Sequence, residues 1–228
     1  MPEAAEAFIQ LAAHELRTPL TVLLGMLQLI LAKQEITDRD CRPLAESALT
    51  EARRIQTIVD DLTEVTRLRI GELSLDRQTA DLNDLAVQAT EGLQGPLTAQ
   101  PLRITRHHEP LPVSADGVRL RRAIQHAMSH VAERAPSQTG VHMRTSLDPG
   151  WAHLLIEGYG ATLHRPPTAS LVRDHREPAL GSSAYLGLRL YLAEQMALLH
   201  GGQLHIQTEP ESTLRVRFSL PLVNGPEG

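Results

Sequence analysis

Apolar side chains recur at helical spacing over the first third of the chain. From about Glu3 to Lys33 they return every three or four residues, which predicts a long amphipathic helix with a coiled-coil-like seam. After a polar loop at 35–40, a second such run extends to about Arg69, with Asp40 as its expected N-cap and Pro43 in its first turn. The expected seams are Ile9, Ala12, Leu16, Leu20, Leu23, Leu27 and Ile30, then Leu44, Ala48, Ala52, Ile55, Val59, Leu62 and Val65.

Two helices of this kind predict an assembly larger than a single hairpin. A helix of about 30 residues is about 45 Å long, and two such helices cannot enclose a core by themselves. Two hairpins from two chains would cover all the apolar stripes. The pattern therefore favours a homodimer held together by a four-helix bundle.

After Arg69 the pattern changes to short strands that alternate with helices. We expect strands at 72–77, 102–105, 111–114, 141–146, 151–157, 203–208 and 214–220, and helices at 81–93, 117–135 and 185–200. The stretch 158–183 has little periodicity and predicts a long loop. The fold class is therefore α+β: a helical hairpin over 1–70, a two-layer α/β sandwich over 71–224, and a tail over 225–228.

Composition and charge exclude several classes of function. The net charge of −5 and the low aromatic content of 3% argue against a nucleic-acid partner. A single cysteine, Cys41, excludes a disulfide framework and suits a reducing compartment. The apolar run from Leu20 to Ala32 is shorter than the ~20 residues that span a bilayer, and the N-terminus lacks a secretory signal. We therefore expect a cytoplasmic chain without a membrane segment.

The sharpest motif lies on the first predicted helix. His14 and Thr18 lie one helical turn apart on the same face, with Glu15 beside the histidine. The helical angle places His14 away from the apolar seam, and Pro19 should bend the helix just beyond it. A neutral imidazole is nucleophilic, and a neighbouring carboxylate orients it and takes its proton. The motif is His14-Glu15-Leu16-Arg17-Thr18-Pro19-Leu20.

This motif, followed by a helical hairpin and an α/β region, resembles the dimerisation and phosphotransfer domain of sensor histidine kinases. The resemblance covers nearly the whole chain. It implies that His14 carries a phosphoryl group and passes it to the aspartate of a response-regulator receiver domain, with Glu15 as the acid/base. It also implies that Thr18 positions a water when the protein dephosphorylates the regulator.

The second half resembles the GHKL-type ATP-binding domain of the same family, but several of its key residues differ. The family has two asparagines one helical turn apart, the second of which binds Mg²⁺, and His126 and His130 occupy those positions. Glu133 stands in place of a phosphate-binding lysine. Ile156 stands in place of the aspartate that recognises adenine, and Glu157, one residue further on a strand, would point to the opposite face.

Some of the glycines that the family has around its nucleotide site are present in this chain. Gly158 and Gly160 match the box that follows the adenine-binding position, whereas Tyr185 replaces a glycine of the phosphate-binding loop and Gly187 keeps one. His200-Gly201-Gly202 and the closing strands match the family's scaffold. We therefore expect a degenerate ATP-binding domain with no cofactor and no metal, in which His126 and His130 are ordinary helix histidines.

Three functions follow from these observations. The first is a homodimeric phosphotransfer protein that exchanges phosphoryl groups with a response regulator through His14 and no longer binds ATP. The second is an active, divergent histidine kinase that uses Mg-ATP. The third is a scaffold that binds a regulator or a partner kinase without chemistry, which the intact His14, Glu15 and Thr18 argue against.

Overall fold

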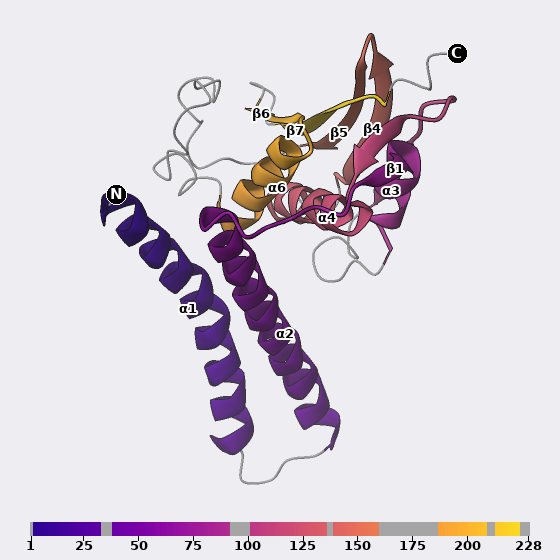
Figure 1. Cartoon of the computed structure of the whole chain (residues 1–228). Helices are drawn as coiled ribbons and strands as arrows, with labels where there is room; N and C mark the ends of the chain where they lie inside the picture. The colour runs from indigo at the N-terminus through magenta and orange to yellow at the C-terminus, as the bar shows by residue number, and fades with distance from the viewer. Residues whose placement is uncertain are drawn as a thin grey trace. The chain divides into compact units, whose positions relative to one another are not determined.

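The computed structural model describes residues 2–32, 38–91, 101–135, 139–159, 187–208 and 213–223 (Figure 1). The chain divides into two compact units. The first unit comprises Met1–Leu73 with Ala179–Leu188, and the second comprises Ser74–Pro178 with Arg189–Gly228.

The first unit is an antiparallel hairpin of two long helices, α1 (Pro2–Ala32) and α2 (Asp38–Arg69) (Figure 1). Both predicted helices are confirmed. The expected start of the second helix is wrong, because α2 begins at Asp38 and Asp40 lies inside it rather than at its N-cap. Pro43 consequently lies beyond the first turn of α2.

The predicted seam of α2 is only partly correct. Ala48 and Val65 are buried as expected, but Val59 is 48% exposed and Ile58 is buried instead. A helix that packs against one partner buries a single narrow stripe, so apolar side chains beside that stripe stay exposed within one hairpin.

A second apolar stripe remains uncovered in the single chain. Leu20, Leu24, Leu27 and Leu31 of α1, spaced four, three and four residues apart, are all more than two-fifths exposed. The 18-residue window Glu15–Ala32 has a mean hydropathy of 1.3, so by length and composition α1 could cross a membrane. This single candidate helix does not decide the matter, so the expectation of a chain without a membrane segment stays a prediction.

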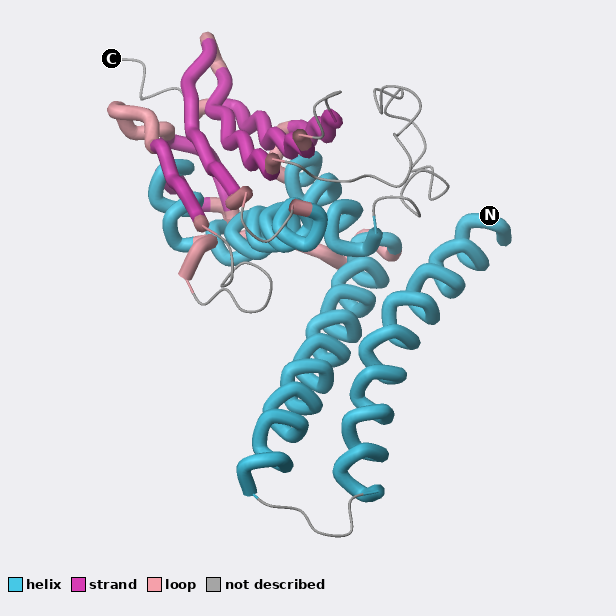
Figure 2. The backbone as a smooth tube through the Cα atoms, turned by 180° about the vertical axis from the view of Figure 1, so that it is seen from behind, coloured by secondary structure: helices cyan, strands magenta, loops and turns pink. Residues whose placement is uncertain are grey.

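The second unit contains a five-stranded mixed sheet in the order β2-β4-β5-β7-β6. Strand β2 is parallel to β4, and the remaining pairs are antiparallel. Helices α3, α4 and α6 lie on one face of the sheet, in the two-layer α+β arrangement expected from the sequence (Figure 2). The elements are β2 (Leu102–Thr105), β4 (Val141–Asp148), β5 (Trp151–Gly158), β6 (Gln203–Thr208), β7 (Leu214–Pro221), α3 (Leu82–Gln88), α4 (Gly117–Arg134) and α6 (Gly187–Leu199).

A small separate sheet pairs β1 (Gln78–Asp81) with β3 (Pro112–Ala115). The predicted strand at 72–77 is wrong: those residues have no strand partner, and the pairing starts at Gln78. The predicted helix over 81–93 is shorter than expected, because α3 ends at Gln88. Asp81 caps this helix, its side chain accepting a hydrogen bond from the Asn83 N–H at 2.9 Å.

The core lies between α4 and the sheet. Leu120, Ile124 and Met128 project from α4, and Leu154 and Phe218 lie on the strands, all of them fully buried. Of the loop predicted at 158–183, Gly158 is the last residue of β5 and 160–183 lie outside the described residues, as does the predicted tail at 225–228.

His200 joins the end of α6 to the start of α4. Its buried Nδ1–H donates to the Met196 carbonyl at 2.7 Å, and its Nε2 accepts from the Asp116 N–H at 3.0 Å. Gly202 is required beside it, since a Cβ there would lie 2.3 Å from the Ser219 carbonyl oxygen. The residues expected to belong to the scaffold therefore have a packing role that is independent of any ligand.

Candidate functional site

The motif of residues 14–20 lies within α1, as predicted. Glu15 is half-buried, Thr18 is exposed and Pro19 is buried. The backbone of His14 belongs to the helix, but its side chain lies outside the described residues, so its expected exposure stays a prediction. Successive helical positions nevertheless bring Glu15 and Thr18 to within one turn of the histidine.

The helix departs from regular hydrogen bonding just after the histidine. Pro19 has no N–H to donate to the carbonyl of Glu15, and the hydroxyl of Thr21 donates to the carbonyl of Arg17 at 2.8 Å. Both features favour a bend, and α1 changes direction near its middle (Figure 1). The carbonyl of Glu15 is thus left without its usual helical donor next to the expected phospho-acceptor.

In the second unit, α4 presents His126 and His130 one turn apart on its buried side. Both are less than one-tenth exposed. Burial lowers the pKa of His126 from 6.5 to about 3, with further lowering by Arg122 and Arg189. Burial likewise lowers the pKa of His130 to about 3, assisted by Arg134 and Arg189. Both imidazoles are therefore neutral at pH 7.

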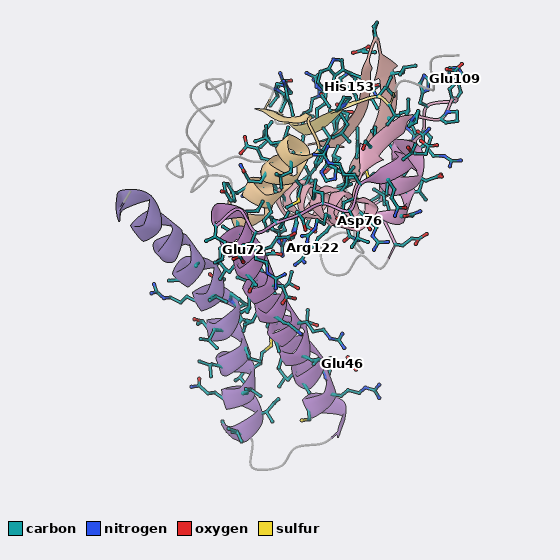
Figure 3. The ribbon with its side chains drawn as sticks, viewed as in Figure 1. Glu46, Glu72, Asp76, Glu109, Arg122 and His153 are labelled. Carbon is teal, nitrogen blue, oxygen red and sulfur yellow. The ribbon has the colours of Figure 1, made fainter. Side chains whose placement is uncertain are left out.

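Charged side chains lie next to these two histidines. The Arg134 Nη1 lies 3.0 Å from His130 Nδ1 and donates to the His130 carbonyl at 3.2 Å. Glu133 accepts from Arg189 Nη1 at 2.5 Å, and the pair ties the last turn of α4 to the first turn of α6. Arg122 emerges from the same helix, nearer its start (Figure 3).

Neighbouring β5 residues face opposite sides of the sheet. Ile156 is fully buried and lies in register with Met143 and Val216, on the side of the helices. Glu157 lies on the other side and accepts from Arg215 Nε at 2.6 Å. The predicted opposite orientation of Ile156 and Glu157 is confirmed by this register.

Gly158 is retained for packing between β5 and α4. A Cβ there would lie 2.6 Å from Val131 Cγ1 and 3.3 Å from Ala135 Cβ. Gly187 is the first residue of α6, and its assignment to a phosphate-binding loop stays a prediction. Gly160 and Tyr185 lie outside the described residues, so their assignment to a nucleotide site stays a prediction.

The described residues do not fit a Mg-ATP site. Mg²⁺ prefers oxygen ligands, whereas the positions expected to supply them hold the neutral imidazoles of His126 and His130. Glu133 is negative where phosphate would bind, and Ile156 has no acceptor for an adenine amino group. Within the described part of the chain, no group of three or more His, Cys, Asp or Glu side chains could hold a metal.

Sequence reasoning missed the role of Arg189. The Glu133–Arg189 pair joins residues 56 positions apart, a separation at which no local pattern indicates contact. The only sequence signal was the position of Arg189 in the first turn of a predicted helix. Its relation to Glu133 emerges once α4 and α6 lie on the same face of the sheet (Figure 2).

Comparison with known proteins adds independent support. Residues 4–71 match the His Kinase A (phospho-acceptor) domain. The chain is 27% identical over 205 residues to the signal transduction histidine-protein kinase/phosphatase MprB of Mycobacterium avium, covering 86% of this chain and 38% of that protein. It is 28% identical over 220 residues to the sensor histidine kinase MtrB of Mycobacterium bovis, covering 93% of this chain and 38% of that protein. The chain thus spans about two-fifths of the length of these curated relatives.

Solved structures show the same fold. The histidine kinase AdeS of Acinetobacter baumannii superposes with a TM-score of 0.68 at 19% identity, covering 92% of this chain and 98% of that chain. Full-length ShkA in complex with AMPPNP superposes with a TM-score of 0.59 at 19% identity, covering 96% of this chain and 46% of that chain. Residues 4–71 therefore belong to the His Kinase A (phospho-acceptor) family, and over most of its length the chain is similar to sensor histidine kinases, whose fold it shares.

Proposed function

We propose that this chain is the phosphotransfer part of a two-component system, a homodimer whose His14 exchanges a phosphoryl group with the aspartate of a response-regulator receiver domain without using ATP. The observation that carries the proposal is the α4 cluster: neutral His126 and His130 beside a Glu133–Arg189 ion pair. This cluster is unsuited to Mg-ATP, whereas the motif on α1 is complete.

The chemistry needs only the residues of that motif and a phosphorylated partner. The acyl phosphate of a regulator aspartate loses its phosphoryl group to the imidazole of His14, so one P–O bond breaks and one P–N bond forms. Glu15 would orient the imidazole and accept its proton, which then returns when the reaction reverses. Neither direction requires a nucleotide.

The homodimer is supported by the uncovered stripe of α1. Leu20, Leu24, Leu27 and Leu31 follow the spacing of a coiled-coil seam and are exposed in the single chain. A second hairpin packed on this stripe would bury them in a four-helix bundle. The same reading places the motif in the cytoplasm, where a regulator is found, and assigns the chain no nucleic-acid partner.

A regulator phosphatase activity is compatible with this proposal. Thr18 is exposed one turn after His14, where a hydroxyl could hold a water beside a regulator's acyl phosphate. The relative MprB is named a kinase/phosphatase. We assign this activity to Glu15 and Thr18 together.

The second candidate function is a divergent histidine kinase that autophosphorylates His14 from Mg-ATP. The fold that this chain shares with ShkA, whose structure contains AMPPNP, favours it. It would require ligands other than the expected asparagines, with His130 or Glu133 acting through a metal. A scaffold without chemistry is the third candidate.

The test is transfer from receiver domains charged with radiolabelled acetyl phosphate. We expect label to appear on the wild-type chain and to be absent from His14→Ala. A Glu15→Gln variant should transfer about 10²-fold more slowly while binding the receiver normally, because it keeps the shape and loses the base. If no label ever transferred, and the receiver bound the chain but lost its phosphoryl group no faster than it does alone, the scaffold function would replace the proposal.

A further inference from the structure

The two faces of the five-stranded sheet differ in chemistry. Alternate residues of the three central strands point to the helices and are mostly apolar and buried, as Val141 and Met143 are on β4. We call the opposite side, away from α4 and α6, the outer face. It is polar, and His153 projects from it (Figure 3).

One row of side chains crosses the outer face on all five strands. In register it runs Thr105, Arg144, Leu155, Arg217 and His205, on β2, β4, β5, β7 and β6. Neighbouring strands lie about 4.8 Å apart, so Arg144 and Arg217 flank Leu155 with their backbones about 10 Å from each other. Both arginines are exposed and Leu155 is half-buried.

The positive charge of this face is not neutralised by the described residues around it. Glu157 lies in the next row, but it is buried and pairs with Arg215. Arg103, Arg144 and Arg217 are exposed and have no ion pair with any described carboxylate. The chain as a whole is negative, at −5, so the positive charge is a local property of this face.

The row beyond contains His153, Ser219 and Gln203, and the carboxylate of Asp148 lies one row further, at the rim of the sheet. His153 Nδ1 lies 2.9 Å from Ser219 Oγ, and its Nε2 lies 3.0 Å from an oxygen of Asp148, which is 69% exposed at the end of β4. His205 contacts Gln203 at 3.1 Å. These contacts involve His153, Ser219, Gln203 and His205 and use neither Arg144 nor Arg217, which leaves both arginines available to a partner.

We propose that the outer face is a docking surface for an acidic protein, whose carboxylates pair with Arg144 and Arg217 around an apolar contact on Leu155. A guanidinium recognises a carboxylate through two parallel hydrogen bonds, and arginine around a small apolar centre is typical of protein interfaces. This inference is independent of the phosphotransfer proposal, since it uses no residue of α1 or of the α4 cluster.

The surface predicts a weak and transient contact. Three rows across five strands cover about 400 Å², around half of what one partner contributes to a stable complex. Exposed ion pairs are screened by salt, so the binding should weaken steeply as ionic strength rises.

A protein is favoured over the other polyanions. The row holds one small ring, the half-buried imidazole of His205, and no Phe, Tyr or Trp on which successive bases could stack, which argues against a single-stranded nucleic acid. Duplex DNA and an anionic membrane present charge over long distances and would meet the net negative charge of the chain. An acidic protein patch presents a few carboxylates at the scale of this row.

The test uses fluorescence anisotropy with a short labelled peptide that has two glutamates on each side of one leucine, at about 20 mM and about 200 mM salt. Arg144→Ser/Arg217→Ser removes the two flanking arginines. The matched control, Arg53→Ser/Arg54→Ser on α2, removes the same charge from two exposed positions. Circular dichroism verifies that both variants fold.

We expect the outer-face variant to bind the peptide at least about fivefold more weakly at low salt and the control to bind as the wild type does. Equal weakening in both variants would show that only net charge matters and would overturn the proposal, as would a wild type that does not bind. Duplex DNA and phosphatidylserine vesicles serve as competitors. If either bound through Arg144 and Arg217 more tightly than the peptide, the assignment to an acidic protein would be wrong.

Discussion

The phospho-acceptor helix and the α4 cluster differ in how closely they match the family: the motif on α1 is complete, whereas the corresponding residues of α4 are changed. On α1 every residue of the motif from His14 to Leu20 is present. On α4 the framework persists, but His126, His130 and Glu133 have replaced the residues that the family uses for Mg-ATP. Under the proposed function the fold persists after its ATP ligand is lost, because packing residues and ligand residues are under separate physical constraints.

The packing constraint is visible at particular positions. Gly158 is kept because α4 leaves no room for a Cβ, and His200 is kept because its ring joins two backbones. Neither position requires a nucleotide. The predictions below test this separation, from the largest expected effect to the smallest.

The largest effect should come from acidification of the second unit. The folded pKa values of His126 and His130, about 3, lie below the unfolded value of 6.5, so the unfolded state binds more protons between these limits. The contribution of the two histidines to the free energy of unfolding is fully present above pH 6.5 and is lost as the pH falls toward about 3. At pH 5 each histidine should cost about 2 kcal/mol, or about 4 kcal/mol together.

Denaturant unfolding between pH 7 and pH 5, followed by near-UV circular dichroism at Trp151, measures this loss. A His126→Gln/His130→Gln variant should have a flatter pH profile, with the remaining histidine contribution due to His200 and His205, whose pKa values burial also lowers. An unchanged profile in that variant would show that the two histidines are not buried and neutral.

Next in size is the effect of a methyl group at Gly158. Gly158→Ala forces a Cβ against Val131 and should lower the free energy of unfolding by about 1–3 kcal/mol. Adding Val131→Ala should recover part of this loss by removing the clash. Gly25→Ala is the matched control on α1, where nothing lies within 4 Å, and it should be neutral or stabilising. Equal effects at the two glycines would contradict the packing role.

The smallest effect concerns the Glu133–Arg189 pair. Its side chains are 30% and 24% exposed, so a double-mutant cycle with alanine should give a coupling of only about 1 kcal/mol. The Arg42–Glu46 pair on α2, at 81% and 66% exposed, should couple by about 0.3–0.5 kcal/mol. A Glu133–Arg189 coupling no larger than that of Arg42–Glu46 would show that the pair does not tie α6 to α4.

Local patterns in the sequence predicted most of the elements. The strand at Leu102–Thr105 and the helix from Gly117 are found as expected, because alternation and helical spacing were clear there. The strand expected at 72–77 failed, since a strand requires a partner and β3 pairs only with 78–81. The predicted burial of Val59 was wrong, because apolar spacing alone does not show which stripe of a helix faces the other helix of the same hairpin.

The sequence predicted which residues form the candidate site wherever they lie in a continuous motif. The residues that replace the Mg-ATP ligands could be identified from position alone. Their protonation and the ion pair that Glu133 forms could not, because both depend on burial and on Arg189, which is distant in the chain. The same holds for the outer face, where arginines of separate strands become neighbours only through register.

The most direct test of the central claim is incubation of the chain with γ-labelled ATP and Mg²⁺, with His14→Ala as control and calorimetry for nucleotide binding. The account predicts no label on the wild type and no binding heat, while the same preparation accepts label from a phosphorylated receiver domain. Label on the wild type that is absent from His14→Ala would contradict the account and establish the chain as a working kinase.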